Sequence, residues 1–448
     1  MKTNSQKQQK SETIIEKQLK RIHINKIARQ TGFYKRMPKK IKAKNLLISF
    51  LMVIWGSKKN TYSVWANKLG LLINDTVSKQ AIAKRINKEL VAFLRDMLKI
   101  IMKRTVPVGV KEITSDKLKI YNRILLEDST SIRLEDRYAK DYPSARRYGK
   151  EPGILKIQTV YEILKKQFLN FEITRFTEND QGYAGKILNI VSPGDLLIRD
   201  LGYFVLGILK KLAEKGVFFI SLAKKEVKIY LKREDEPIDL AKMLKKRGNL
   251  DIQVFLGKEE KLPVRLIAIP VDQEVASTRI RKARKEYRWV HKKDYYFLLR
   301  WNLLITNIAQ EQISSTDIYR IYSLRWRIEI IFKSWKSSLG IKKVPKDGNQ
   351  IRLEAYIYCM LIFILLFQVN YYNYYIKEIC RDRDPKQSQL SLLKFMNFMV
   401  SNLNLFIDKI YFKSMCLNKL LKKQIIYHCL YELRTDRVNF NQVLVNLG

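Results

Sequence analysis

The stretch Tyr322–Lys336, YSLRWRIEIIFKSWK, carries the strongest signal in the sequence. As one helix turning about 100° per residue, it gathers an acid, three cations and a tyrosine into one polar stripe. The stripe consists of Tyr322, Arg325, Glu329, Lys333 and Lys336, and the apolar face beside it of Ile328, Ile331, Phe332 and Trp335. Spacing alone leaves two interpretations open: a salt-bridged surface helix, or a metal-binding acid beside side chains that hold phosphates.

Two further carboxylates follow apolar runs that are typical of buried strands. Asp128 comes after the run ILLE, and Asp200 comes after LLIR. In a sheet whose strand ends face a cleft, both carboxylates can point towards one place. Two divalent cations about 4 Å apart, held by shared carboxylates, activate a water or a 3′-hydroxyl and stabilise the leaving oxygen of a phosphodiester. Asp136 and Asp141 compete with Asp128 for the first position.

The charge of the chain indicates a polyanionic partner. Lys plus Arg total 86 against 43 for Asp plus Glu, a formal charge of +43 that is spread along all 448 residues. Nucleic acid is the usual partner of such a chain. An anionic membrane surface is the alternative, and the absence of a single basic cluster disfavours it.

Several classes of site are excluded by residue usage. The four cysteines have no CxxC spacing, which argues against a disulfide framework or a zinc site and fits a reducing cytosol. Three scattered histidines make a catalytic triad improbable. The motifs GxxxxGK[ST], GxSxG and HExxH are also missing. Carboxylates are therefore the expected metal ligands.

One uncharged segment, residues 355–376, tests the membrane alternative. Its most hydrophobic part spans about a dozen residues, fewer than the roughly 20 needed to cross a bilayer. We therefore expect a buried core helix rather than a membrane helix. The N-terminus has no apolar region of the kind found in signal peptides.

A helix, short turn and basic helix are predicted near the N-terminus. Ser78 is a plausible N-cap for a second helix that runs through residues 79–100. Its apolar positions recur at helical spacing and leave Lys79, Lys84, Arg85 and Lys88 facing outwards. This pattern fits a DNA-reading helix-turn-helix, and an ordinary helical hairpin with a solvated face is the alternative.

The middle of the chain has strand periodicity. Strands are expected at 119–126, 154–164, 167–176 and 195–199, the second and third joined by a tight turn at Lys165-Lys166. Helices are expected at 183–191 and at 205–215, closed by Gly216. Strand patterns return between Val217 and Ile269, then a basic helix at 279–288 and a buried strand within 295–308. From Ser315 onwards the pattern is helical.

At this point the sequence resembles a known family. Tyr322, Arg325, Glu329 and Lys336 match the Y-(2)-R-E-(6)-K signature of IS4-family insertion-sequence transposases. The family's first acid resembles Asp128 in LLEDST, and its second resembles Asp200 in LLIRDLGYF. The run WNLLITNI before the signature and the basic run Arg279–Arg288 are also similar.

The resemblance implies a fold and a division of the chain. The expected fold class is α/β: an RNase H-like catalytic core, a mixed sheet flanked by helices, with a β-rich insertion domain, an N-terminal all-helical domain and a helical C-terminal region. The expected division is a basic tail at 1–25, a helical DNA-binding domain at 26–108, the first part of the catalytic core at 109–215, the insertion at 216–290, the second part of the core at 291–375, and a C-terminal region at 376–448 with dimerisation as its candidate role.

The resemblance also implies roles for residues. Asp128, Asp200 and Glu329 would be the catalytic acids and would bind Mg²⁺ or Mn²⁺, with two ions expected. Tyr322, Arg325 and Lys336 would contact the transposon-end strand, whereas Lys333 has no assigned family role. Some members place an indole against a flipped base, and Trp289 is a candidate by location, with packing as the alternative.

The expected function is a DNA transposase that binds terminal inverted repeats and catalyses metal-dependent cleavage and strand transfer. Its expected partners are double-stranded DNA at the transposon ends and target and a second copy of the chain, with no membrane, in the bacterial cytoplasm at the nucleoid. Two alternatives remain open: a non-catalytic transposase-derived DNA-binding protein, and an RNase H-like nuclease that cuts without strand transfer.

Overall fold

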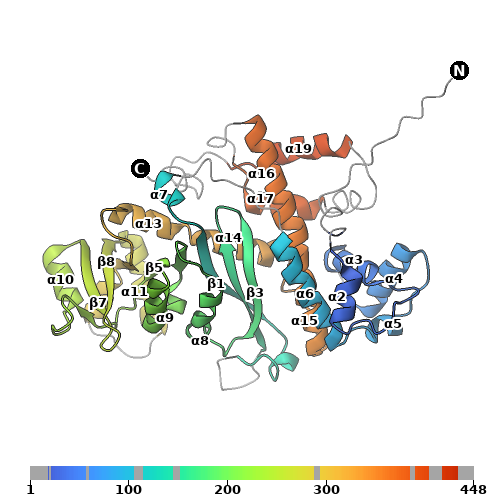
Figure 1. Ribbon diagram of the computed structural model, residues 1–448, viewed down its shortest axis with the longest axis horizontal. Coiled ribbons are helices and arrows are strands. Elements are labelled where there is room, and N and C mark those ends of the chain that lie inside the picture. Colours follow the sequence, from blue (N-terminus) through green and yellow to red (C-terminus); the bar gives the residue numbers. More distant parts are fainter. Residues whose placement is uncertain are drawn as a thin grey trace.

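A mixed nine-stranded sheet with helices on both faces forms the centre of the molecule (Figure 1). The computed structural model describes residues 19, 22–56, 60–104, 115–144, 152–286, 293–383, 389–402 and 416–431. Most of the predicted tail at 1–25 and the candidate Trp289 therefore lie outside the described residues.

The strand order is β3-β2-β1-β4-β5-β9-β8-β7-β6. Strand β4 runs parallel to β1 and β5, and the other neighbouring strands are antiparallel. A mixed sheet of this kind, flanked by helices, fits the RNase H-like core that the sequence predicts. The strand bounds are β1 (Ile124–Arg133), β2 (Ile154–Glu162), β3 (Gln167–Arg175), β4 (Leu196–Arg199), β5 (Phe218–Leu222), β6 (Ile229–Tyr230), β7 (Leu250–Leu256), β8 (Leu262–Pro270) and β9 (Trp301–Thr306).

The first three strands form the predicted antiparallel meander. Lys166 adopts a positive φ of 52° in the tight turn between β2 and β3. The predicted first strand is wrong at both ends, because Asp116–Lys119 forms the short helix α7 and β1 continues to Arg133. The length of β2 explains the extension, because β2 supplies register partners for β1 from Leu125 as far as Arg133.

Helix α9 (Leu206–Glu214) connects β4 to β5 and confirms the predicted helix before Gly216, whose φ is +73°. The helix predicted at 183–191 is instead a single α-turn, α8 (Asp180–Tyr183), followed by the 3-10 helix η3 (Ala184–Asn189). Two further 3-10 turns are η2 (Asp136–Tyr138) and η4 (Leu201–Tyr203).

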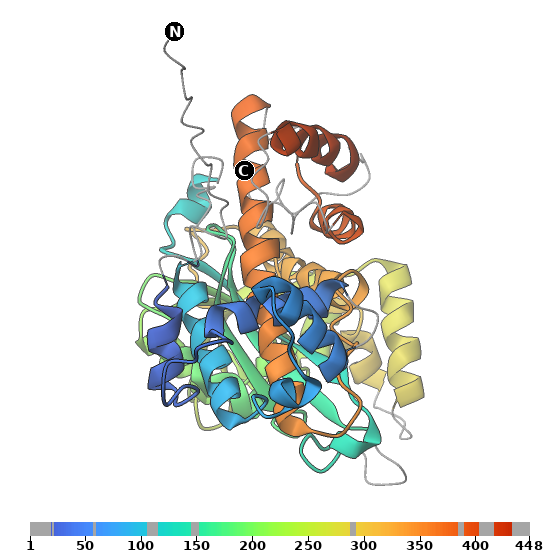
Figure 2. The ribbon, with the colours of Figure 1, turned by 90° about the vertical axis from the view of Figure 1, so that its right-hand side faces the viewer.

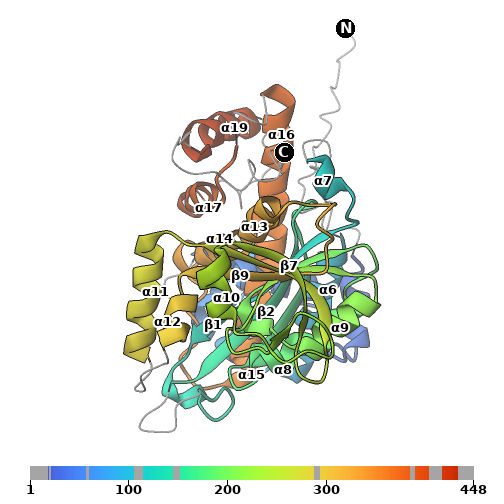
Figure 3. The same cartoon turned by 90° about the vertical axis from the view of Figure 1, so that its left-hand side faces the viewer.

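The strands β6–β8 continue the sheet beyond β9 together with helices α10 (Leu240–Arg247), α11 (Gln273–Glu286) and α12 (Lys293–Leu298). Figure 3 shows α11 and α12 next to each other at one side of the sheet. The guanidinium of Arg279 in α11 donates to Asn302 Oδ1 of β9 at 2.8 Å. The buried strand predicted within 295–308 is correct only from Trp301, because its first part belongs to α12.

Before α7, the described residues form the helices α2 (Ile24–Gln30), α3 (Ala43–Gly56), α4 (Tyr62–Ile73), α5 (Lys79–Ala83) and α6 (Lys88–Arg104). Ser78 caps α5 as predicted, by accepting from Ala81 N. The single helix expected after it is wrong, because α5 ends at Ala83 and Asn87 Oδ1 accepts from Leu90 N, at 2.9 Å, to begin α6.

The helices after the sheet are α13 (Ser315–Ser323), α14 (Trp326–Ser337), α15 (Gln350–Phe363), the π-turn η5 (Ile364–Val369), α16 (Asn370–Asp382), α17 (Leu392–Ser401) and α19 (Cys416–Cys429). Helices α15, η5 and α16 form one continuous helix of 33 residues that is long and apolar enough to cross a membrane. The most apolar part of this helix is 89% buried by the rest of the chain, in agreement with the predicted core helix. Figure 2 shows the N-terminal helices against its lower half.

Two apolar cores lie on opposite faces of the sheet. The larger contains Ile124 and Leu126 of β1 together with α14, α15 and the N-terminal helices. The smaller contains Leu125 of β1 together with α9, α10 and strands β7 and β8. This alternation follows from the two-residue period of a strand.

Trp335 links α14 to the long helix. Its side chain is fully buried, and its indole N–H donates to Gln368 Oε1 at 3.1 Å.

We expect Trp335→Ala to lower the free energy of unfolding by about 3–5 kcal/mol, because it leaves a large cavity. Chemical denaturation measures this. Trp326→Ala is the matched control, since Trp326 is 61% exposed on the same helix and its loss should change stability by less than about 0.5 kcal/mol. Equal effects of the two changes would contradict the packing described here.

Candidate active site

Two of the predicted acids come from neighbouring parallel strands. The register of β1 and β4 pairs Glu127 with Arg199, so that Asp128 and Asp200 are the next residue on each segment. Asp128 lies in the middle of β1, opposite Thr159 of β2, and not at a strand end as expected. Asp200 does follow the end of its strand.

Local hydrogen bonds orient both carboxylates. The Ser129 N–H donates to Asp128 Oδ1 at 2.7 Å, and Asp200 caps η4 by accepting from Gly202 N at 3.5 Å. Gly202 leaves room in this turn for the Asp180 side chain, because a Cβ at this position would lie 3.2 Å from Asp180 Oδ2. Each acid is therefore held by the backbone that directly follows it.

The predicted helical stripe at Tyr322–Lys336 is divided between two helices. Helix α13 ends at Ser323 and α14 begins at Trp326, with Leu324 and Arg325 between them in right-handed helical conformation. Because these two residues keep helical dihedrals, Arg325 and Glu329 still meet, although they do not share one uninterrupted helix.

The third acid and the arginine of the signature complete the site. Arg325 Nη1 lies 2.5 Å from Glu329 Oε1, 3.7 Å from Asp200 Oδ1 and 3.9 Å from Asp128 Oδ2. Residues that are as much as 201 positions apart in the chain thus meet around one guanidinium nitrogen. The salt-bridge interpretation of the stripe is correct for Arg325 and Glu329, and it coexists with the convergence of the acids.

The environment of Asp128 opposes its negative charge. Burial, together with the nearby carboxylates of Asp200 and Glu329, raises the pKa of Asp128 to about 7, against the lowering effects of the Ser129 hydrogen bond and Arg325. Burial also raises the pKa of the Tyr322 hydroxyl. Tyr322 lies beneath Arg325, whose guanidinium carbon is 5.7 Å from the centre of its ring.

The three acids open onto a cavity of about 560 Å³. Its other lining residues include three lysines, Lys333, Lys336 and Lys342. Sequence reasoning missed Lys342, because it lies beyond the end of α14 and no helical spacing connects it to Glu329. Asp136 and Asp141 do not line the cavity, so geometry favours Asp128 over these two competitors.

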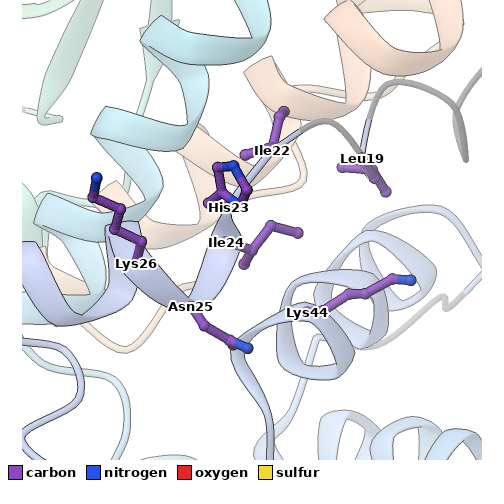
Figure 4. Close-up of a pocket in the computed structure, with 7 residues that line it drawn as sticks. All are labelled: Leu19, Ile22, His23, Ile24, Asn25, Lys26 and Lys44. Carbon is purple, nitrogen blue, oxygen red and sulfur yellow. The ribbon is translucent and has the colours of Figure 1, made fainter.

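A second cavity shows that size alone does not identify the site. Figure 4 shows a pocket of about 580 Å³ beside the start of α2, lined by Leu19, Ile22, His23, Ile24, Asn25, Lys26 and Lys44. It contains no carboxylate among these lining residues. Of these two cavities, the one at α14 combines acids with a cationic rim, which is the combination that metal-assisted phosphate chemistry requires.

The predicted N-terminal contacts are separate from this cavity. Lys79 and Lys84 are exposed on and directly after α5, among the helices at the far side of the long helix (Figure 1). Arg85 is half-buried and donates to Ala81 O at 2.7 Å, so it does not face outwards as expected.

The acid cluster fits a hard divalent cation by its chemistry. Each of the three carboxylates has an oxygen within 4 Å of one point, and carboxylate oxygens are preferred ligands of such ions. In the part of the chain that the structure describes, no three His, Cys, Asp or Glu side chains have a metal-ligand arrangement. The acids face Arg325 instead, so cation binding requires this side chain to move.

Comparisons with known proteins agree with the geometry. A sequence profile of the family described as "Transposase DDE domain" matches residues 122–364, more than half of the chain. The chain is 30% identical over 390 residues to the transposase for insertion sequence element IS1151 of Clostridium perfringens. The aligned region covers 81% of this chain and 80% of that relative. It is 29% identical over 367 residues to the transposase for insertion sequence element IS231E of Bacillus thuringiensis subsp. finitimus, covering 77% and 76%.

Metal binding can be measured without a reaction. A ligand that binds the folded state stabilises it by mass action, by about 2.7 kcal/mol at one hundred times its Kd. We expect Mn²⁺ to raise the unfolding temperature of the wild-type protein and to have a much smaller effect on Asp128→Asn. Asp136→Asn is the control and should keep the full Mn²⁺-induced shift. A full shift in Asp128→Asn would remove Asp128 from the ligand set.

Proposed function

This chain belongs to the family of transposases with a DDE domain, and from this membership we propose that it cuts and joins DNA at the ends of an insertion sequence. It is an enzyme that acts on DNA. The proposed reaction is hydrolysis of a phosphodiester at each terminal inverted repeat, followed by transfer of the freed 3′-hydroxyl to target DNA. This proposal rests on one observation: an oxygen atom of each of the three carboxylates lies within 4 Å of Arg325 Nη1.

The proposed catalytic residues are Asp128, Asp200 and Glu329. DDE transposase domains use divalent metal ions, and we propose that these three carboxylates hold them, with Mg²⁺ or Mn²⁺ as the ion and two ions in the complete site. When bound, the ions would supply a nucleophilic oxygen and stabilise the leaving oxygen. The chain itself would orient the acids through the backbone N–H groups of Ser129 and Gly202.

The proposed DNA contacts form a rim around the acids. Arg325, Lys333, Lys336 and Lys342 line the same cavity, and guanidinium and ammonium groups bind phosphate oxygens. Tyr322 is 9% exposed and packs below Arg325, so its proposed role is to support Arg325 until DNA arrives. Burial and the neighbouring Lys342 lower the pKa of Lys336, and a DNA phosphate in the cavity would oppose both effects.

The proposed division of the chain follows the predicted domains, with one change. We propose a helical DNA-binding unit at 26–108 that uses the exposed Lys79 and Lys84 but not Arg85, a catalytic core in two parts, and a C-terminal region from 376 that contributes to a homodimer. Since β5 pairs with β4, we propose that the insertion begins after Leu222 rather than at 216. The proposed place of action is the bacterial nucleoid.

Glu329→Gln should abolish metal-dependent nicking and leave DNA binding intact. The change removes one negative charge from the site but keeps the shape of the side chain, so we expect a loss of at least about 10³-fold in rate, or about 4 kcal/mol of transition-state stabilisation. The assay is nicking of a duplex carrying the inverted repeats that flank the gene, with a gel shift for binding. Glu311→Gln, at an exposed acid outside the cavity, is the control and should nick at the wild-type rate. Wild-type nicking by Glu329→Gln would exclude it as a catalytic acid.

DNA binding should weaken steeply with salt. Release of counterions from many phosphates predicts a loss of about 10³-fold or more in affinity between about 50 and 200 mM salt. Lys333→Gln and Lys336→Gln should each reduce the slope of log affinity against log salt by about 1. Lys346→Gln, at an exposed lysine outside the cavity, should leave the slope unchanged. A flat salt dependence of the wild-type protein would exclude phosphate contacts as the main source of affinity.

A further inference from the structure

The pairing between β1 and β4 is short and has an ion pair at each end. The two strands are joined through four register pairs, from Ile124 with Leu196 to Glu127 with Arg199. Before the first pair, the Arg123 guanidinium donates to Asp195 Oδ1 at 2.9 Å. At the last pair, Arg199 Nε lies 2.7 Å from Glu127 Oε2. The register ends there, and the next residue on each segment is a proposed catalytic acid.

The second ion pair is completely buried on the face opposite the acids. The side chains of Glu127 and Arg199 are 1% and 0% exposed. Glu127 Oε1 and Arg199 Nη1 are also buried, and neither has a hydrogen-bond partner among the described residues. A buried ion pair that leaves polar atoms unsatisfied does not stabilise a fold more than an apolar pair of similar volume does. A contribution to the stability of the fold therefore does not explain why a charged pair, and not an apolar pair, occupies these two positions.

Arg199 connects the strand pair to the turn that carries Asp200. Its Nη2 donates to Ala184 O at 2.9 Å, and its guanidinium carbon lies 5.3 Å from the centre of the Tyr203 ring. Tyr203 closes the η4 turn that Asp200 begins, and its hydroxyl donates to Gln158 Oε1 of β2 at 2.5 Å. One buried guanidinium thus contacts β1, η3 and η4 from behind the acids.

We propose that Glu127 and Arg199 are positioning residues that hold Asp128 and Asp200 at the separation needed for catalysis. The proposal rests on the proposed function of the two acids. No register pair lies beyond Glu127 and Arg199, so this ion pair stands at the last point where the two strands are joined before the chain turns away in η4. A displacement of about 1 Å at a reacting centre reduces rates by about 100-fold.

The test is the double variant Glu127→Leu/Arg199→Met, which removes both charges and keeps an apolar pair of similar size. We expect it to fold and to bind terminal-repeat DNA like the wild type. Its nicking rate should fall by about 100-fold, and the Mn²⁺ concentration for half-maximal nicking should rise by about tenfold, as expected when the groups behind metal ligands are lost. Wild-type rate and Mn²⁺ dependence in this variant would overturn the proposal.

The matched control is Arg123→Met/Asp195→Asn, which neutralises the ion pair at the other end of the same two strands. It should keep the wild-type nicking rate and Mn²⁺ dependence, because four register pairs separate it from the acids. An equal loss in both double variants would indicate a general weakening of the strand pair and would also overturn the proposal.

Two further measurements separate the possible failures. If the first double variant does not fold, the single variant Glu127→Gln tests the proposal instead, because it keeps the shape of the side chain and removes only its charge. A rise of several-fold in half-saturating Mn²⁺ supports positioning, and an unchanged value overturns it. A wild-type protein that does not nick DNA with any divalent cation would instead contradict the proposed function.

Discussion

Three carboxylates can be brought to one partly buried point only if positive charge lies among them, and the rest of the site follows from this constraint. Without a cation, the repulsion between the acids and the loss of their hydration would force one of them to take up a proton. In this chain Arg325 supplies the charge from the junction of α13 and α14, and Lys333, Lys336 and Lys342 extend it to the rim. The same constraint makes the site suitable for divalent cations and for a polyanionic substrate.

The sheet meets this constraint by separating charges on its two faces. Successive residues of a strand point to opposite faces, so Asp128 faces α14 while Glu127 faces the smaller core with Arg199. Breaking such a buried pair by removing one partner destabilises a protein by about 3–5 kcal/mol. The acids thus project from a part of the sheet that has a second, buried set of charges on its opposite face.

That Glu329 and Asp200 lie close together could be predicted from the sequence, because the signals of both residues are local. The spacing from Tyr322 to Lys336 survives the break between α13 and α14, since Leu324 and Arg325 keep helical dihedrals. Asp128 was assigned to a strand end because its own sequence does not reveal that β2 is long enough to pair beyond it. The roles of Arg199 and Lys342 could not be predicted, because each depends on residues brought together only by the fold. The helix predicted from Ser78 failed for the opposite reason, since the Asn87 side chain caps a new helix within an otherwise regular pattern.

The position of Arg325 has a consequence for the order in which the site is filled. Its Nη1 lies within 4 Å of an oxygen of all three acids, so a divalent cation and this guanidinium exclude one another there. In the proposed function, a DNA phosphate that binds Arg325 would draw it away from the acids and raise their affinity for the cation. By thermodynamic linkage, a bound cation would raise the affinity of Arg325 for DNA by the same factor. One side chain would thereby couple DNA binding to cation binding, so that each ligand would favour the other.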